Sequence, residues 1–172
     1  VKLSRVKEIE SEIKHDVMAL VRALAEACGS SGAYVHLGAT SSDIGDTASA
    51  LQLKEATELI MQRLDDLERT LMEGAEKYKK TIMIGRTHGQ HALPTTLGFK
   101  FAFWMRQNSR NIQRLRQCTE RLLVGKMSGA VGTQAGLGPH AMRIQELIMK
   151  RLGIKAAGTS SQIVPRDLHG EL

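Results

Sequence analysis

One long amphipathic stretch constrains the fold of this chain more than any other feature. Between Ala48 and Tyr78, apolar residues recur in steps of three and four, with charged residues between them. These positions are Leu53, Ala56, Ile60, Leu64, Leu67, Leu71, Ala75 and Tyr78. The spacing places them on one face of an α-helix, which would extend for roughly 45 Å. A face of that length must be covered by other helices, so the stretch predicts a bundle of long helices.

The rest of the chain also has a helical pattern. Residues 1–28 predict a helix that ends at Gly29. A second apolar stripe follows Pro94 and runs to about Val124, and a third helix is predicted from Pro139 to Leu152. Aromatic residues make up only 3% of the chain, which is typical of seams filled by aliphatic side chains. We therefore predict an all-α fold in which two long rods, joined by a short polar junction, form an antiparallel bundle that other chains complete.

Composition narrows the class of protein. With 172 residues, of which 42% are hydrophobic, the chain can form one ordinary core. Cys28 and Cys118 lie far apart in helical stretches, which predicts reduced thiols and a cytoplasmic protein rather than disulfides or a zinc site. No apolar run approaches the roughly 20 residues that span a membrane. The sequence begins at Val1 within an amphipathic pattern, so we expect it to be a piece of a longer protein.

The net charge of +6 and the pI near 9.5 suit a small anionic substrate, or reflect a local excess of basic residues in a fragment. Nucleic acid is a weaker interpretation, because the arginines are spread along one predicted helix without stacking aromatic residues. These arginines are Arg106, Arg110, Arg114, Arg116 and Arg121. We predict no nucleic-acid or membrane partner.

Four segments rich in Gly, Ser, Thr and His interrupt the helical pattern. They are GSSGAYVHLGATSSDIGDT at 29–47, GRTHGQHALPTT at 85–96, GKMSGAVGTQAGLGPH at 125–140 and GTSSQIVPRDLH at 158–169. In the third of these, GAVGTQAG lacks a preceding strand and the spacing of a dinucleotide loop, so it predicts a turn or a tight backbone crossing.

The segment at 36–47 has features of a helix start. Ser42, Asp43 or Asp46 can cap the helix that follows. Capping does not explain why Thr40 and Ser41 place two hydroxyls where the amides of a helix N-terminus converge. Such an arrangement predicts a cradle for a carboxylate or a phosphate.

The segment at 85–96 combines a helix start with a candidate catalyst. Pro94 and the threonines after it can begin the next helix. Gly85 and Gly89 bracket His88 and allow close approach of the backbone to a ligand. Because the unperturbed pKa of histidine lies near neutrality, His88 can transfer a proton at working pH, and a satisfied loop histidine is the alternative.

The other histidines give weaker signals. His15 stands beside Asp16 in a helical stretch, which by itself is more typical of a surface or capping residue. His88 and His91 are three residues apart, but in a junction that contains Gly and Pro rather than on one helix face. We therefore predict no metal site.

Five segments together resemble one family. HDVMALV, HLGATSSDIGDT, GRTHGQHALPTT, GKMSGAVGT and SQIVPRD, in this order and spacing, are similar to the adenylosuccinate lyases of the fumarase/aspartase superfamily. The resemblance covers the chain from about His15 to His169. It implies a long-helix bundle, incomplete in this fragment, with residues 1–40 in an N-terminal helical domain and residues 41–172 in the central bundle domain. It also implies a homotetramer of the full-length protein whose active sites combine segments of different subunits.

The reaction implied by the resemblance is β-elimination. Fumarate leaves adenylosuccinate, giving AMP, and leaves the succinyl-carboxamide intermediate of purine biosynthesis, without a metal or an organic cofactor. The substrate would be an anionic nucleotide.

The resemblance also assigns roles to single residues. His88 matches the histidine that acts as general acid on the departing nitrogen, and Thr87, Thr40 and Ser41 match hydroxyls that hold the carboxylates of the succinyl group.

Three further residues match the family's substrate contacts. His15 and His36 match histidines near the phosphate end of the substrate, and His15 is also a candidate for proton transfer. Gln162 matches the glutamine of a Thr-Gln pair, with Ser161 in place of the threonine.

One departure limits the fragment. The family's flexible serine loop, which carries the general base, does not occur before Leu172, so we expect this chain alone to bind little and to turn over nothing. Two alternatives stay open: a carboxymuconate cycloisomerase, whose corresponding segment is close to GRTHGQHALPTT, and a non-enzymatic helical scaffold with basic faces. His88 together with the HDV sequence at 15–17 favours the adenylosuccinate lyases.

Overall fold

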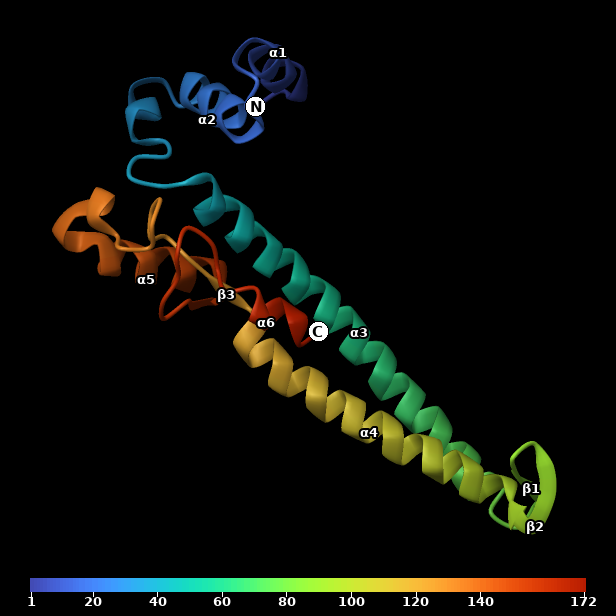
Figure 1. Cartoon of the computed structure of the whole chain (residues 1–172). Coiled ribbons are helices and arrows are strands. Elements are labelled where there is room, and N and C mark those ends of the chain that lie inside the picture. Colours follow the sequence, from blue (N-terminus) through green and yellow to red (C-terminus); the bar gives the residue numbers. More distant parts are fainter. The chain divides into compact units, whose positions relative to one another are not determined.

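The computed structural model describes residues 1–172 and is dominated by helices (Figure 1). The α-helices are α1 (Leu3–Ile13), α2 (Asp16–Ala27), α3 (Ser41–Lys77), α4 (Leu97–Leu122), α5 (Ala141–Leu152) and α6 (Asp167–Gly170). Two 3₁₀ helices, η1 (Gly29–Tyr34) and η2 (Ala135–His140), connect them. The strands are β1 (Ile82–Thr87) and β2 (Gln90–Thr96), which pair antiparallel, and β3 (Val124–Gly125) and β4 (Lys155–Ala156), which pair parallel. The predicted all-α class is confirmed, and none of the helices has the length and apolar character needed to cross a membrane.

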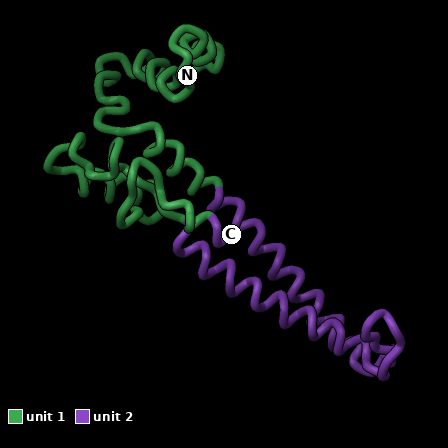
Figure 2. Tube along the Cα trace, viewed as in Figure 1, with its two compact units in different colours: residues 1–52, 123–169 green, residues 53–122, 170–172 purple.

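The chain divides into two compact units (Figure 2). Unit 1 contains residues 1–52 and 123–169, and unit 2 contains residues 53–122 and 170–172. Helix α3 begins in unit 1 and ends in unit 2. The predicted domain boundary after residue 40 concerns the family's full-length architecture and stays a prediction.

In unit 1, α1 and α2 form a small hairpin around the buried side chains of Ile9, Ala19 and Ala23. The prediction of one continuous helix through residue 28 was wrong. Lys14 adopts a left-handed backbone with φ 54°, and His15 then caps α2 by accepting the Met18 N–H at its Nδ1, 3.3 Å away. A left-handed residue followed by a side-chain cap ends one helix and begins another.

In unit 2, the second half of α3 lies beside α4, so the two predicted rods are confirmed (Figure 1). Asn108, which interrupts the apolar stripe of α4, is buried, and its Nδ2 donates to the carbonyl of Leu64 at 2.8 Å. A buried polar side chain that has one good partner favours a single register between two helices.

The predicted polar junction between the rods is a β-hairpin. Thr87 pairs with Gln90, so His88 and Gly89 form a two-residue turn with φ of 50° and 72°. Positive φ at both central residues is the geometry that matches the twist of a hairpin. The prediction that Pro94 begins the next helix was wrong, because Pro94 lies in β2 and Thr96 caps α4 by accepting the Phe99 N–H at 3.1 Å.

Two helical glycines should respond oppositely to the same substitution. A Cβ on Gly98 would lie 2.5 Å from the carbonyl oxygen of Ala75 and from backbone atoms of Lys79, whereas a Cβ on Gly45 would meet nothing within 4 Å. We expect Gly98→Ala to lower the free energy of unfolding by roughly 1–3 kcal/mol through overpacking. Gly45→Ala should raise it by about 0.5–1 kcal/mol, because alanine loses less conformational entropy in a helix. Urea unfolding of both variants checks this, and equal effects would contradict the packing described for Gly98.

Candidate active site

The first turn of α3 is organised around one buried carboxylate. Asp43 Oδ2 accepts the backbone N–H groups of Thr40 at 2.9 Å and Gly129 at 3.0 Å. Its Oδ1 accepts the Ser128 N–H at 2.9 Å and pairs with the Nζ of Lys126. The side chains of Asp43 and Lys126 are both completely buried.

The charges of this pair compensate each other. Burial by itself would raise the pKa of Asp43, but the hydrogen bonds from Lys126 and from the amides of Ser128, Thr40 and Gly129 outweigh it and hold the pKa below its usual range. Asp43 is therefore ionised at neutral pH.

The contacts of Asp43 correct the predicted helix cap. The prediction that Ser42, Asp43 or Asp46 caps the helix was wrong, because α3 already begins at Ser41. Thr40 precedes the helix, and Asp43 reaches back to the Thr40 N–H as the acidic residue of a capping box does.

Thr47 and Asp46 extend the same arrangement. Thr47 Oγ1 accepts the Lys126 N–H at 3.1 Å and lies 3.2 Å from the Lys126 carbonyl oxygen. Asp46 accepts the Val164 N–H at 2.7 Å and the Arg166 guanidinium at 2.8 Å. The start of α3 therefore holds two segments that lie far away in the sequence, GKMSGAVGT and SQIVPRD.

These two segments also contact each other. The hydroxyls of Ser128 and Ser160 are 2.9 Å apart, beside a polar cavity of about 190 Å³ that Gln134 and Gln145 also line. Gly132 has φ +81°, and a Cβ there would lie 2.0 Å from the Ser160 carbonyl oxygen. The predicted tight backbone crossing is confirmed, and only glycine fits it.

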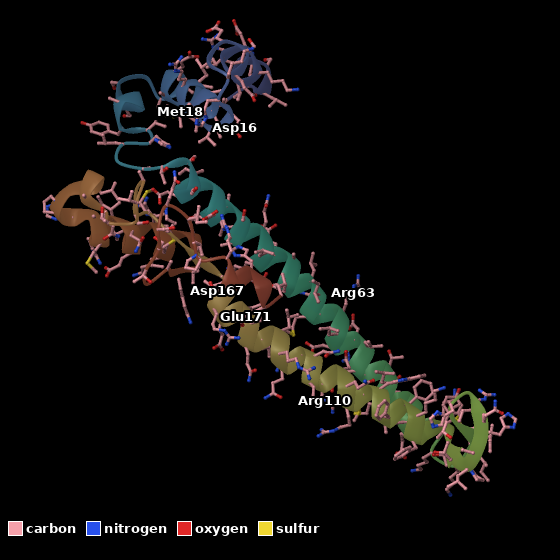
Figure 3. The ribbon with its side chains drawn as sticks, in the orientation of Figure 1. Asp16, Met18, Arg63, Arg110, Asp167 and Glu171 are labelled. Atoms are coloured by element: carbon pink, nitrogen blue, oxygen red, sulfur yellow. The ribbon has the colours of Figure 1, made fainter.

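Most of the predicted site residues lie in unit 1. Thr40 is buried, Ser41 is the first residue of α3, and Gln162 lies in an exposed turn. His15 is the cap of α2 described above, so the capping interpretation is confirmed (Figure 3 shows Asp16 and Met18 at the start of that helix). His36 has φ 68°, and its Nε2 is buried without a hydrogen-bond partner.

Thr87 and His88 lie in unit 2, at the exposed end of the β-hairpin. His88, like His36, has a left-handed backbone, with φ 50°. Non-glycine residues are uncommon in this conformation and cluster at functional sites. Nothing in the structure tests the catalytic or binding role of any of these residues, which stay predictions.

The role of Lys126, and the roles of Asp43 and Asp46 beyond capping, were not predicted from the sequence. The signal for Lys126 was a single lysine in a segment of glycines, serines and apolar residues. Because lysine is rarely buried unless it is paired, a lysine in such a segment indicates a buried ion pair. His169, whose Nδ1 is buried without a partner, was not singled out either. No three of the chain's His, Cys, Asp and Glu side chains are grouped as metal ligands.

The fold and these segments define the class of protein: the chain belongs to the lyase family, whose family model, described as "Lyase", matches residues 2–172. Among curated relatives, the adenylosuccinate lyase of Pyrococcus horikoshii is 57% identical over 172 residues, which are 100% of this chain and 38% of the relative.

Solved structures agree with the family. A fumarate lyase from Mesorhizobium sp. BNC1 superposes with a TM-score of 0.91 at 34% identity, covering 99% of this chain and 40% of that one. A 3-carboxy-cis,cis-muconate lactonizing enzyme from Pseudomonas putida superposes with a TM-score of 0.83 at 37% identity, covering 92% of this chain and 37% of that one. The chain thus spans about two fifths of the length of the proteins it matches.

Lys126 should control how stability depends on pH. Because the pKa of Asp43 is lower in the folded than in the unfolded chain, its contribution to stability is present above about pH 3.9 and is lost as the pH falls through the folded pKa. Lys126→Met removes a hydrogen bond that lowers the pKa of Asp43. In this variant the unfolding free energy should therefore rise less steeply with pH at about pH 3.9 than in the wild type, or should fall with pH. Urea unfolding across acidic pH measures the slope.

The matched control for this experiment is Lys79→Met, because Lys79 pairs with Glu76 in an exposed position. An unchanged slope in Lys126→Met would contradict the role assigned to the buried pair.

Proposed function

We propose that this chain is part of an adenylosuccinate lyase, which eliminates fumarate from adenylosuccinate to give AMP and from the succinyl-carboxamide intermediate of purine biosynthesis. The observation that carries the proposal is the 57% identity to a relative of that name across the whole chain. The reaction as proposed uses no metal and no organic cofactor, and the protein would be cytoplasmic.

Thr40 and Ser41 are proposed to hold the carboxylates of the succinyl group, with Thr87 as a third hydroxyl. The N-terminus of α3 supports this role, because its amides favour an anion. A carboxylate at Asp43 would normally weaken such a site. The buried pairing with Lys126 neutralises that charge, so the helix end remains attractive to a second carboxylate.

His88 is proposed as the general acid on the departing nitrogen. Proton removal next to a carboxylate places charge on that carboxylate, so fixed donors stabilise the transition state while an acid protonates the leaving amine. The exposed position of His88 on a tight two-residue turn supports this role, because the turn fixes the backbone while leaving the imidazole accessible.

His15 and His36 are proposed to contact the nucleotide near its phosphate, with His15 also a candidate for proton transfer. His15 uses Nδ1 to cap α2, which places the proton of the neutral ring on Nε2 and makes that atom a donor. His36 Nε2 has no protein partner. Gln162 is proposed to bind the substrate through its amide.

A second candidate function is that of a carboxymuconate cycloisomerase. The superposition on the Pseudomonas putida lactonizing enzyme favours it. The identity is lower than that to the archaeal adenylosuccinate lyase, 37% against 57%, so we rank it second.

Activity of the full-length protein separates these candidates. We expect fumarate release from adenylosuccinate, and a loss of about 10²–10⁴-fold in kcat for His88→Ala, because a positioned general acid contributes that much. His91→Ala, on the same hairpin, is the matched control and should retain activity. Turnover of carboxymuconate without turnover of adenylosuccinate would move the protein to the second candidate.

A homotetramer is proposed for the full-length protein, with active sites that combine several subunits. In unit 2, exposed apolar side chains support this, among them Leu59 at 62%, Phe99 at 69% and Phe103 at 56% exposure. We propose no nucleic-acid or membrane partner; Arg63 on α3, which pairs with Asp66 at 3.7 Å, and Arg110 on α4 are labelled in Figure 3.

Self-association tests the proposed assembly. We expect the chain to sediment as oligomers at micromolar to millimolar concentrations, because covering these apolar side chains removes them from water. Replacing Phe99 and Phe103 together by serine should shift the distribution toward monomers. A wild-type chain that remains a well-behaved monomer at high concentration would argue against a shared bundle.

A further inference from the structure

We infer that Asp46 is a positioning residue, which sets Gln162 in a fixed relation to the start of α3; this inference rests on the proposed lyase function. Asp46 lies 118 and 120 residues before its two partners in the sequence. Its Oδ2 accepts the Val164 N–H at 2.7 Å and its Oδ1 accepts the Arg166 Nη2 at 2.8 Å. Each carboxylate oxygen thus has one donor, and both donors belong to the segment that follows Gln162.

The contact is partly protected from water. The side chain of Asp46 is 11% exposed, whereas that of Arg166 is 50% exposed. Val164, between Gln162 and Arg166, is 1% exposed and anchors the segment in unit 1. Hydrogen bonds that involve a charged group are shorter and stronger than neutral ones, and they strengthen when water is excluded.

Gln162 lies at the apex of a turn. The Ser161 N–H donates to the Ile163 carbonyl at 3.2 Å, and Ser161 Oγ accepts the Ile163 N–H at 3.4 Å. This turn leaves Gln162 exposed. The bonds within the turn set its shape but do not fix where it lies. Its position depends on the anchor at Val164 and Arg166 after it and on the contact of Ser160 with Ser128 before it.

The anchor lies on the helix that begins with Ser41. Asp46 follows Ser41 by less than two turns, about 7.5 Å along the axis, in a continuous helix. The bonds to Asp46 therefore tie the segment that carries Gln162 to the helix that begins with Ser41. Asp46 touches none of the proposed reacting atoms and acts through Gln162.

The proposed role makes a specific kinetic prediction. The amide of Gln162 would bind the substrate alike in the ground state and the transition state, so its misplacement weakens uniform binding. In the full-length protein we expect Asp46→Ala to raise the KM for adenylosuccinate about tenfold or more, with kcat changed by less than about threefold. Asp46→Asn should have a smaller effect, because its amide oxygen still accepts the Val164 N–H.

Coupling between residues distinguishes positioning from general stabilisation. If Asp46 acts through Gln162, Asp46→Ala should raise KM little in a chain that already carries Gln162→Ala. The matched control is Asp66→Asn, an exposed aspartate on α3 that pairs with Arg69 of the same helix, and its KM should equal that of the wild type. Thermal unfolding confirms that each variant is folded, and Asp46→Asn keeps the test informative if Asp46→Ala does not fold.

The outcomes separate this inference from the proposed function. Absence of fumarate release by the wild-type protein overturns the proposed function. Normal release with an unchanged KM in both Asp46 variants, a loss confined to kcat, or additive effects of Asp46→Ala and Gln162→Ala overturns the positioning role alone.

Discussion

Unit 1 depends on the ion pair and the hydrogen bonds that the buried carboxylate of Asp43 forms. Four donors from separate parts of the chain converge on it: the Thr40, Ser128 and Gly129 amides and the Lys126 ammonium. A buried ion pair of this kind adds little net stability compared with apolar packing, because both charges must be desolvated. Its effect is on specificity. Any arrangement that separates the GKMSGAVGT segment from α3 leaves a charge in the interior without a partner, and such states are disfavoured.

The spacing along α3 explains how one helix holds two segments. Asp46 and Thr47 follow Asp43 by three and four residues, so the three side chains lie on one face. That face binds Lys126 through Asp43 and Thr47, and Val164 and Arg166 through Asp46. Acidic residues in the first turns are also favourable to the helix dipole. The face is thus occupied by structural contacts, and the hydroxyls of Thr40 and Ser41 remain at the helix end, where the proposed substrate would bind.

How much could be predicted from the sequence depended on the range of the interactions involved. Periodicity placed the long part of α3 and α4 correctly, because an apolar stripe is a local signal. The start of α3 was missed although its signal is local, because Thr40 and Asp43 have the spacing of a capping box. The pairing of Asp43 with the Ser128 and Gly129 amides could not be predicted, because these residues lie more than 80 positions away in the sequence. The β-hairpin was missed because its signal is one-sided: β-branched residues precede His88-Gly89 at Ile82, Ile84 and Thr87, whereas the run that follows, QHALPTT, contains a proline that argues against a strand. The five segments indicated the family, but the contacts that these segments make with one another could not be predicted from the sequence.

The choice of histidine at position 88 is not explained by the fold. A two-residue turn with positive φ at both positions favours Asn or Gly at the first of them, because these residues tolerate the left-handed backbone best. Histidine is less common there than Asn or Gly and, at the exposed tip of the hairpin, contributes no buried contact that would favour it. Residues in sparsely populated backbone conformations cluster at functional sites. The same reasoning applies to His36, which combines φ 68° with a buried nitrogen that has no partner in the chain. Lys14 and Gln134 also have positive φ, as cap residues of α1 and η2, so the left-handed backbone alone does not mark a site. The physical argument for a role of these histidines rests on the exposed position of His88 and on the unpartnered nitrogen of His36.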